Sequence, residues 1–219
     1  MRRFLDLVVL LSIFPVLIPL LLIAFFIKKI ADGNPVFYNS VRLGKGRVPI
    51  LVFKFRTMII DGGFIANEIK NYSDGGFEAI PLSSSVYTSV GRLYERTQLV
   101  ETPQIINIIR GEMSFVGYRP LPVSHYELLC LKVGEHLTNS RFAHQPGLTG
   151  MAQLFGKSNL TYMQRIQIEI NEGLFYDSQG MYFYKIILYI YTLIGTLFYV
   201  LSGRAPLVGL VYKKLLSKI

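Results

Sequence analysis

The sequence is poor in cysteine and has few acidic residues relative to basic ones. Of its 219 residues only Cys130 is a cysteine, so no disulfide can form within the chain and the fold needs no oxidising compartment. Its 14 Asp and Glu residues stand against 23 Lys and Arg, which gives a formal net charge of +9. This excess favours anionic ligands such as nucleic acid, phosphate-rich molecules or an acidic membrane leaflet. Composition does not choose among them.

Internal repeats and long low-complexity tracts are also missing, so we expect one compact unit. Apolar residues, in contrast, are abundant. They make up 51% of the chain, and the mean hydropathy is +0.39. Such a composition favours contact with lipid over a purely soluble protein.

Residues 7–27 contain no charged side chain and lie between basic flanks. At ~1.5 Å per residue, a helix of this length could cross a hydrocarbon core of roughly 30 Å, as an ordinary transmembrane anchor would. Pro15 and Pro19, however, each remove a hydrogen bond from the helix interior and predict a bend. A bent helix that returns to its starting face also places both basic flanks on the cytoplasmic side. We therefore favour a re-entrant helix over a straight span or a cleaved signal peptide, whose apolar region is usually shorter.

The globular part is expected to begin with a turn at residues 32–35 and a short strand at residues 36–38. Residues 50–58 also have strand character, and their alternation puts Lys54 and Arg56 on one face. Two cations close together on an apolar strand should face water or an anionic ligand. A solvated edge strand protected by lysine is the alternative.

Residues 91–120 carry the most information. Thr102 suits a helix cap, Pro103 the first helical position and Gly111 the stop, which predicts a helix from Pro103 to Arg110. Glu101 would then lie just outside a helix N-terminus, where the dipole keeps a carboxylate ionised and ready to hold a metal ion. The alternative is that Glu101 only complements the dipole.

Two further arginines are candidates for phosphate binding. Arg119 lies in a loop constrained by Gly117 and Pro120, after a short strand expected at residues 113–116. Arg141 precedes the segment 146–150, which we interpret as a rigid turn held over a site. A fixed guanidinium suits bidentate phosphate binding, although either residue alone could be an ordinary surface arginine.

Two more helices are expected from apolar patterning. Residues 64–69 favour a short amphipathic helix. The apolar, aromatic-rich residues 186–201 could span the membrane if the helix is slightly longer, but we favour a helix that lies in the membrane interface.

Four motifs follow one another along the chain. They are Lys54-Phe55-Arg56-Thr57-Met58, Glu101-x-Pro103-Gln104 followed by Asn107, Gly111 to Pro120 (GEMSFVGYRP), and Pro146-Gly147-Leu148-Thr149-Gly150-x-x-Gln153. With these motifs, the chain from Arg2 to about Pro206 resembles the bacterial sugar transferase family, the monotopic phosphoglycosyl transferases. Arg3-x-x-Asp6 and Pro19 also match the re-entrant helix of that family.

We therefore expect a mostly helical α+β fold. Residues 1–31 would form a re-entrant membrane helix, and residues 32–219 a small cytoplasmic domain with short strands and interfacial amphipathic helices, one of them at about 181–203. The resemblance places the protein at the cytoplasmic face of the bacterial inner membrane.

The resemblance also implies a reaction. The family transfers a sugar 1-phosphate from a nucleoside diphosphate sugar to polyprenol phosphate (undecaprenyl phosphate), the step that initiates lipid-linked glycan or exopolysaccharide assembly. It uses an Asp-Glu pair and Mg²⁺, and the Asp forms a covalent phosphosugar-enzyme. Carried over by motif, Glu101 is the catalytic and metal-binding glutamate. Lys54, Arg56, Arg119 and Arg141 are the basic positions that bind substrate phosphate.

The sequence departs from the family pattern at several of these positions. Val100 occupies the place of the nucleophilic Asp and has no lone pair to attack with. The other departures are Tyr118 for Pro, Thr102 for Leu, Glu95 where Arg is usual, Asn171 about where a second Asp is expected, and a segment 84–88 without the usual Asp and Arg.

Three functional hypotheses follow. The first is an active transferase that uses Glu101 or Glu95 as nucleophile. The second is a catalytically degenerate member that acts as a binding or regulatory partner in glycan assembly. A nucleic-acid-binding domain is the third, disfavoured because the basic arm or aromatic-basic interleaving of such modules is missing. A homodimer or a partner protein from the glycan pathway stays open.

Overall fold

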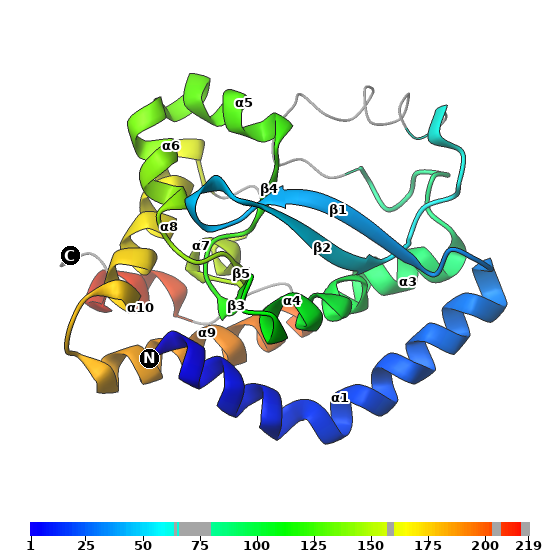
Figure 1. Cartoon of the computed structure of the whole chain (residues 1–219), viewed down its shortest axis with the longest axis horizontal. Helices are drawn as coiled ribbons and strands as arrows, with labels where there is room; N and C mark the ends of the chain where they lie inside the picture. The colour runs from blue at the N-terminus through cyan, green and yellow to red at the C-terminus, as the bar shows by residue number, and fades with distance from the viewer. Residues whose placement is uncertain (64, 66–79, 157–159, 203–206, 216–219) are drawn as a thin grey trace.

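The computed structural model describes residues 1–63, 65, 80–156, 160–202 and 207–215. Within these residues the fold is α+β and mostly helical, with two small sheets and a long N-terminal apolar helix, as expected (Figure 1). The helix expected at residues 64–69 lies outside the described residues, except for residue 65.

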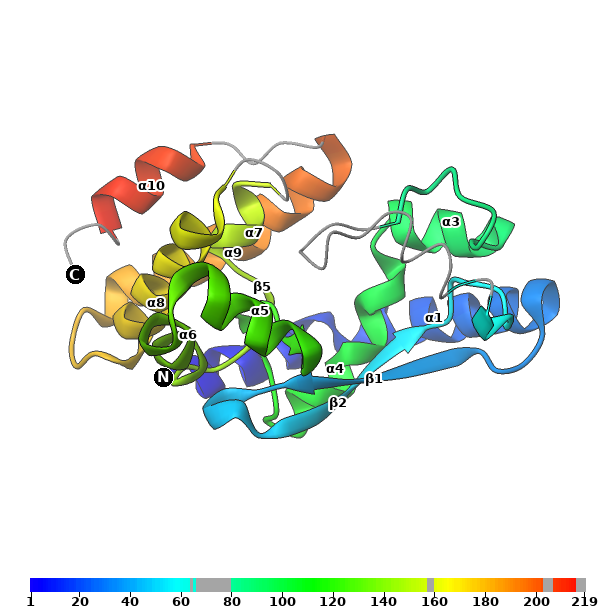
Figure 2. The same cartoon turned by 90° about the horizontal axis from the view of Figure 1, so that it is seen from above.

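The larger sheet has three antiparallel strands in the order β2-β1-β4. β1 (Phe37–Leu43) and β2 (Pro49–Phe55) form a long hairpin, visible along one side of the molecule in Figure 2. β4 (Leu121–Pro122) pairs with the end of β1. The expected strand at residues 36–38 therefore begins one residue later and runs much further.

The smaller sheet pairs β3 (Ser114–Val116) in parallel with β5 (Gly147–Thr149). The expected turn at residues 146–150 is wrong, because this segment is a strand. Gly147 lets the backbone of β5 lie very close to that of Gly117, because a Cβ at Gly147 would be only 2.2 Å from the Gly117 nitrogen.

Helices make up most of the remaining elements. The long ones are α1 (Arg2–Asp32), α8 (Tyr162–Asp177) and α9 (Tyr182–Ser202). α9 matches the helix expected at about 181–203. The shorter ones are η1 (Lys45–Arg47), α3 (Ser89–Arg96), η2 (Leu99–Gln104), α4 (Ile105–Ile109), α5 (Ser124–Val133), α6 (Glu135–Phe142), α7 (Met151–Leu154) and α10 (Val208–Leu215).

The helix expected from Pro103 to Arg110 is wrong at its start. Residues 99–104 form the 3₁₀ helix η2 instead, and α4 follows from Ile105. Thr102 is not a cap, because its hydroxyl donates back to the carbonyl oxygen of Leu99 at 2.7 Å. Glu101 therefore lies in the first turn of η2 rather than outside a helix.

α1 is one continuous helix that bends near its middle (Figure 1). Pro15 and Pro19 lie inside it and account for the bend. The globular body lies on the concave side, so both arms of α1 reach back to it (Figure 1).

The first arm is attached through Arg3. Its guanidinium donates hydrogen bonds to the carbonyl oxygens of Ile108 and of Ile109, the latter at 2.7 Å. These carbonyls are at the C-terminal end of α4, where a cation also complements the helix dipole.

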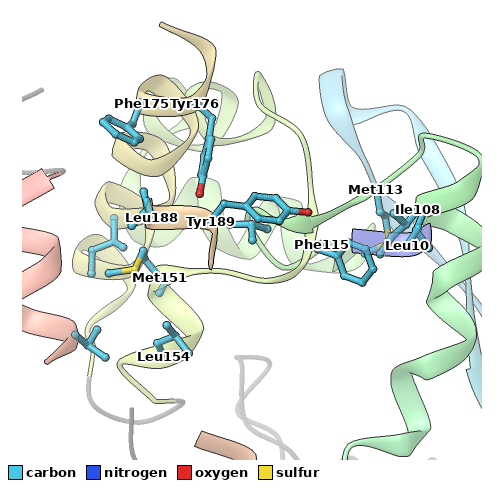
Figure 3. Close-up of a cluster of buried hydrophobic side chains, with 14 of the residues drawn as sticks. Leu10, Ile108, Met113, Phe115, Met151, Leu154, Phe175, Tyr176, Leu188 and Tyr189 are labelled. Atoms are coloured by element: carbon cyan, nitrogen blue, oxygen red, sulfur yellow. The ribbon is translucent and has the colours of Figure 1, made fainter. Parts of the chain in front are cut away.

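Asp6 makes the most buried attachment of this arm. Its carboxylate is 2% exposed and accepts from the Ser114 hydroxyl at 2.8 Å and the Phe115 backbone N–H at 2.9 Å. The Tyr189 hydroxyl of α9 donates to the same oxygen at 2.6 Å. In Figure 3 the Tyr189 ring lies between two groups of core side chains, with its hydroxyl toward Phe115 and Leu10. One carboxylate thus joins α1, β3 and α9.

The second arm is attached to β2 and α3. The Thr88 hydroxyl donates to the carboxylate of Asp32 at 2.6 Å, and the Arg56 guanidinium donates to the Asp32 carbonyl oxygen at 2.8 Å. The Tyr94 hydroxyl donates to the carbonyl oxygen of Ala24 at 2.5 Å. Both ends of α1 are therefore attached to the same body by polar contacts.

The middle of α1 and the outer face of α9 are apolar and exposed. These two helices are the ones, within the described part of the chain, that are long and apolar enough to cross a membrane by length and composition. Only 11% and 28% of their most apolar windows are buried, so neither is the core helix of a soluble domain. Exposed apolar surface of this extent is stable in contact with lipid.

Replacing Asp6 should destabilise the whole fold. In Asp6→Ala three buried donors lose their acceptor, which we expect to cost about 3 kcal/mol or more. Thermal unfolding of the full chain in detergent measures this, with exposed Glu135→Ala on α6 as the control. A melting temperature equal to that of the control would contradict the role given to Asp6.

Candidate active site

Lys54, Glu101 and Arg119 form one charged cluster. Lys54 lies near the end of β2, Glu101 on η2, and Arg119 in the loop between β3 and β4. The Lys54 ammonium donates to Glu101 Oε1 at 3.0 Å. The Arg119 guanidinium binds both carboxylate oxygens, at 2.5 Å to Oε1 and 3.0 Å to Oε2. Three of the predicted site residues are therefore brought together.

Arg42 of β1 joins this cluster, and our sequence analysis missed it. Arg42, Lys54, Glu101 and Arg119 line one small cavity together with Gln104. Three cations thus surround one carboxylate, which leaves a local excess of positive charge. In the β1–β2 hairpin, residue 38 pairs with Lys54, and Arg42 lies on the same face of β1 as residue 38, which places Arg42 beside the cluster.

Electrostatics in the cluster are dominated by burial and by the ion pairs. Burial alone would raise the pKa of the Glu101 carboxyl, but Arg119 and Lys54 together hold it well below its usual range. Burial lowers the pKa of Lys54, and Glu101 opposes that effect. The charge of Glu101 raises the pKa of Arg119. Glu101 is therefore ionised at neutral pH.

Arg56 is not part of the cluster. Its guanidinium is buried and donates to the carbonyl oxygens of Pro35 at 2.6 Å and Met58 at 2.9 Å, in addition to Asp32. The expected shared face with Lys54 fails because β2 ends at Phe55, one residue before Arg56. Arg56 fastens the end of α1 to the chain that follows β2.

Arg141 lies behind the cluster. It is fully buried, forms an ion pair with Glu169 of α8, and donates to the Arg119 carbonyl oxygen at 2.7 Å. Its guanidinium also stacks on the ring of Tyr118, 4.3 Å from the centroid. Arg141 thus holds the backbone of the Arg119 loop, while its buried Nη1 has no hydrogen-bond partner among the described residues.

Val100 faces away from the cations. It is 5% exposed and belongs to an apolar group with Ala24 of α1, Val36, Phe55 and Tyr94. Val100, where the family resemblance leads us to expect an aspartate, therefore makes an apolar contact with the second arm of α1.

Two more of the departures have structural partners. Glu95 of α3 accepts a hydrogen bond from the Thr57 hydroxyl at 2.8 Å and does not line the cavity of the charged cluster. Asn171 of α8 donates to the Tyr212 hydroxyl of α10 at 3.1 Å. Asn171 thus serves the packing of α10.

Within the described residues, no three His, Cys, Asp or Glu side chains gather into a group that could hold a metal ion. Mg²⁺, however, needs only one or two carboxylates when substrate phosphates supply further oxygens. Glu101 is one such carboxylate, but both of its oxygens accept hydrogen bonds from Lys54 and Arg119. It would hold Mg²⁺ only once those donors turn to substrate phosphate.

The burial of Val100 predicts how Val100→Asp should behave. A carboxyl placed among apolar side chains has a raised pKa, so the folded state disfavours its ionised form. The variant should lose stability as the pH rises from about 4 through that raised value. Thermal unfolding across this range, with Val100→Asn as the isosteric neutral control, measures the effect. Parallel pH curves for the two variants would contradict the burial.

Comparison with known families and proteins agrees with this geometry. Residues 1–203 match the bacterial sugar transferase family. The exopolysaccharide production protein ExoY of Sinorhizobium fredii is 31% identical over 173 residues, covering 77% of this chain and 74% of that protein.

Two longer relatives are matched over part of their length. The UDP-glucose:undecaprenyl-phosphate glucose-1-phosphate transferase of Caulobacter vibrioides is 32% identical over 157 residues, 71% of this chain and 54% of that protein. The undecaprenyl-phosphate galactose phosphotransferase of Salmonella typhimurium is 28% identical over 174 residues, 77% of this chain and 35% of that protein. The family match covers nearly the whole chain, and this protein therefore belongs to the bacterial sugar transferase family.

Proposed function

We propose that this protein transfers a sugar 1-phosphate from a nucleoside diphosphate sugar to polyprenol phosphate, a step of exopolysaccharide assembly. The observation that carries the proposal is the cluster of Arg42, Lys54 and Arg119 around ionised Glu101. Both substrates are anionic, and a site that unites them must neutralise their charge. The relatives whose names describe transfer to undecaprenyl phosphate support this assignment.

The cations bind the diphosphate of the donor. In the free protein Arg119 and Lys54 are paired with Glu101, so their donors are held in position before substrate arrives. Phosphate oxygens then compete for these donors and loosen the hold on Glu101. Arg119 is the more adaptable partner, because its side chain is 37% exposed against 17% for Lys54.

Glu101 is the nucleophile in this proposal, since Val100 cannot be. A carboxylate oxygen of Glu101 attacks the β-phosphorus of the donor, and the bond from that phosphorus to the bridging oxygen breaks as nucleoside monophosphate leaves. A phosphate oxygen of polyprenol phosphate then attacks the same phosphorus and releases the Glu101 carboxylate. The products are the lipid diphosphate sugar and the free enzyme.

Mg²⁺ is the cofactor that the donor set suits. Bound by Glu101 together with substrate phosphates, it would neutralise charge that develops on the leaving phosphate.

We also propose that α1 enters and leaves the membrane on the cytoplasmic face of the bacterial inner membrane, and that α9 lies in the interface. The contacts of both arms of α1 with one body support the first point, because a straight span would carry Asp32 and Asp6 to opposite faces. The exposed apolar face of α9 supports the second. Lipid-linked acceptor and soluble donor would then meet beside the membrane surface.

The degenerate alternative has no support from these relatives, whose names describe transferases or a polysaccharide production protein. With valine at position 100, the cationic cluster still contains the carboxylate of Glu101, which is available as a nucleophile.

Glu101→Gln tests the proposed chemistry. The amide keeps the size of the side chain but removes the attacking charge, so we expect turnover to fall at least about 100-fold. Full-length protein is assayed with labelled nucleoside diphosphate sugar, Mg²⁺ and polyprenol phosphate. Exposed Glu127→Gln on α5 is the control and should keep normal turnover.

A second readout separates Glu101 from a merely structural role. Without the lipid acceptor, phosphosugar label should stay covalently on the unmodified chain and not on Glu101→Gln. If Glu101→Gln retained the label, another residue such as Glu95 would be the nucleophile. No turnover by the unmodified chain with any donor would overturn the proposed function.

A further inference from the structure

A second, larger cavity lies at the start of α1, away from the reactive cluster. Its volume is about 620 Å³, and it is lined mainly by the first turns of α1 and α9, the C-terminal end of α8 and the loop after α4. None of its lining residues lines the cavity of the Glu101 cluster. The size is ordinary for a small-ligand site.

The lining of this cavity carries an excess of positive charge. The basic side chains are Arg2, Arg3, Lys45 and Lys185, and the carboxylates are Asp6 and Asp177. Asp6 already accepts three hydrogen bonds from β3 and α9, so it faces the protein interior. Arg3 already donates to the Ile109 carbonyl oxygen at 2.7 Å, and buried Lys185 donates to that of Ser178. Arg2 and Lys45 are therefore the side chains best placed to meet an anion.

Arg2 has hydrogen-bonding capacity to spare. The residue is 9% exposed, and its Nε has no hydrogen-bond partner among the described residues. Its other contacts are long, at 3.3 Å to Asp177 and 3.4 Å to the carbonyl oxygen of Gln145. A buried, unpartnered guanidinium nitrogen costs free energy unless an acceptor reaches it. An anion in the cavity would supply that acceptor.

The surroundings favour an anion that belongs to a lipid. Phe4 and Leu7 of α1 and Phe183 of α9 lie close in sequence to the lining residues and are 67%, 48% and 71% exposed. Acyl chains could lie along these apolar faces while a phosphate occupies the cavity. Basic pockets between membrane-facing helices are suited to anionic headgroups.

We propose that this cavity binds the phosphate headgroup of an anionic membrane phospholipid. The occupant is not the acceptor substrate, because the phosphate of the acceptor must reach Glu101, which lines the other cavity. A bound phospholipid would join α1, α8 and α9 at the membrane surface. The inference rests on the proposed docking of α1 and α9 to the membrane and not on the proposed chemistry.

Native mass spectrometry of the full-length protein released from nanodiscs tests the inference. The nanodiscs contain equal amounts of phosphatidylglycerol and phosphatidylcholine, which differ in headgroup charge. We expect selective retention of phosphatidylglycerol. Lys45→Gln should reduce that preference about fivefold, the usual contribution of one cation near an anionic headgroup.

The control is Lys214→Gln on α10, an exposed lysine with the same change of charge outside the cavity, which should keep the preference. Arg2→Gln should reduce the preference further, and Arg2→Lys should restore part of it. Because Arg2 also stacks on Tyr176, Arg2→Gln could unfold, and the pair Lys45→Gln and Lys214→Gln then decides the question.

Several outcomes would overturn the inference. Equal retention of the two phospholipids, or equal effects of Lys45→Gln and Lys214→Gln, would mean that the cavity selects no headgroup. Two further experiments add undecaprenyl phosphate to the nanodiscs, or inorganic phosphate to the protein in detergent. Retention of undecaprenyl phosphate in place of phosphatidylglycerol would overturn the inference, because the cavity would then bind the acceptor. If inorganic phosphate in detergent raised the melting temperature as much as phosphatidylglycerol does, the cavity would bind a soluble anion and the inference would also be overturned. Normal transferase activity without lipid selectivity would remove this inference and leave the proposed function intact.

Discussion

The structure depends on the attachment of both arms of a bent apolar helix to one globular body. At one end Asp6 joins α1 to β3 and α9 through three buried hydrogen bonds. At the other end Asp32 is held by Thr88 and Arg56. Pro15 and Pro19 lie between these ends, and each removes a backbone hydrogen bond of the helix, which favours the bend. Without both attachments, the apolar middle of α1 would be free to straighten away from the body.

That constraint also positions the charged cluster. The second arm of α1 packs on an apolar group that includes Val100 and Phe55, which lie directly before Glu101 and after Lys54 in the chain. The same elements that contact α1 therefore present Lys54 and Glu101 on their other side, toward Arg42 and Arg119. The valine at position 100 adds to the apolar packing that supports this scaffold.

Much of this arrangement was predictable from local patterns, and the rest was not. The apolar run with two prolines predicts a bent α1, and alternation around Lys54 predicts β2. Pairing across a hairpin or between distant strands depends on backbone approach, so Arg42 was missed and the β5 strand was interpreted as a turn. Arg56 and Arg141 match motifs as well as Arg119 does, but the sequence does not show that they are buried against carbonyl oxygens and Glu169.

The most direct test of this account is the topology of α1. One variant carries a single cysteine inserted after the initiator Met1, which is exposed, and another carries Asn34→Cys; both are made in a Cys130→Ser background, which has no other cysteine. A membrane-impermeant maleimide is applied to intact spheroplasts and to inverted membrane vesicles. The account predicts that both positions react only in inverted vesicles, because both ends of α1 lie at the cytoplasmic face. Reaction of one position from each side would show a straight span and contradict the account.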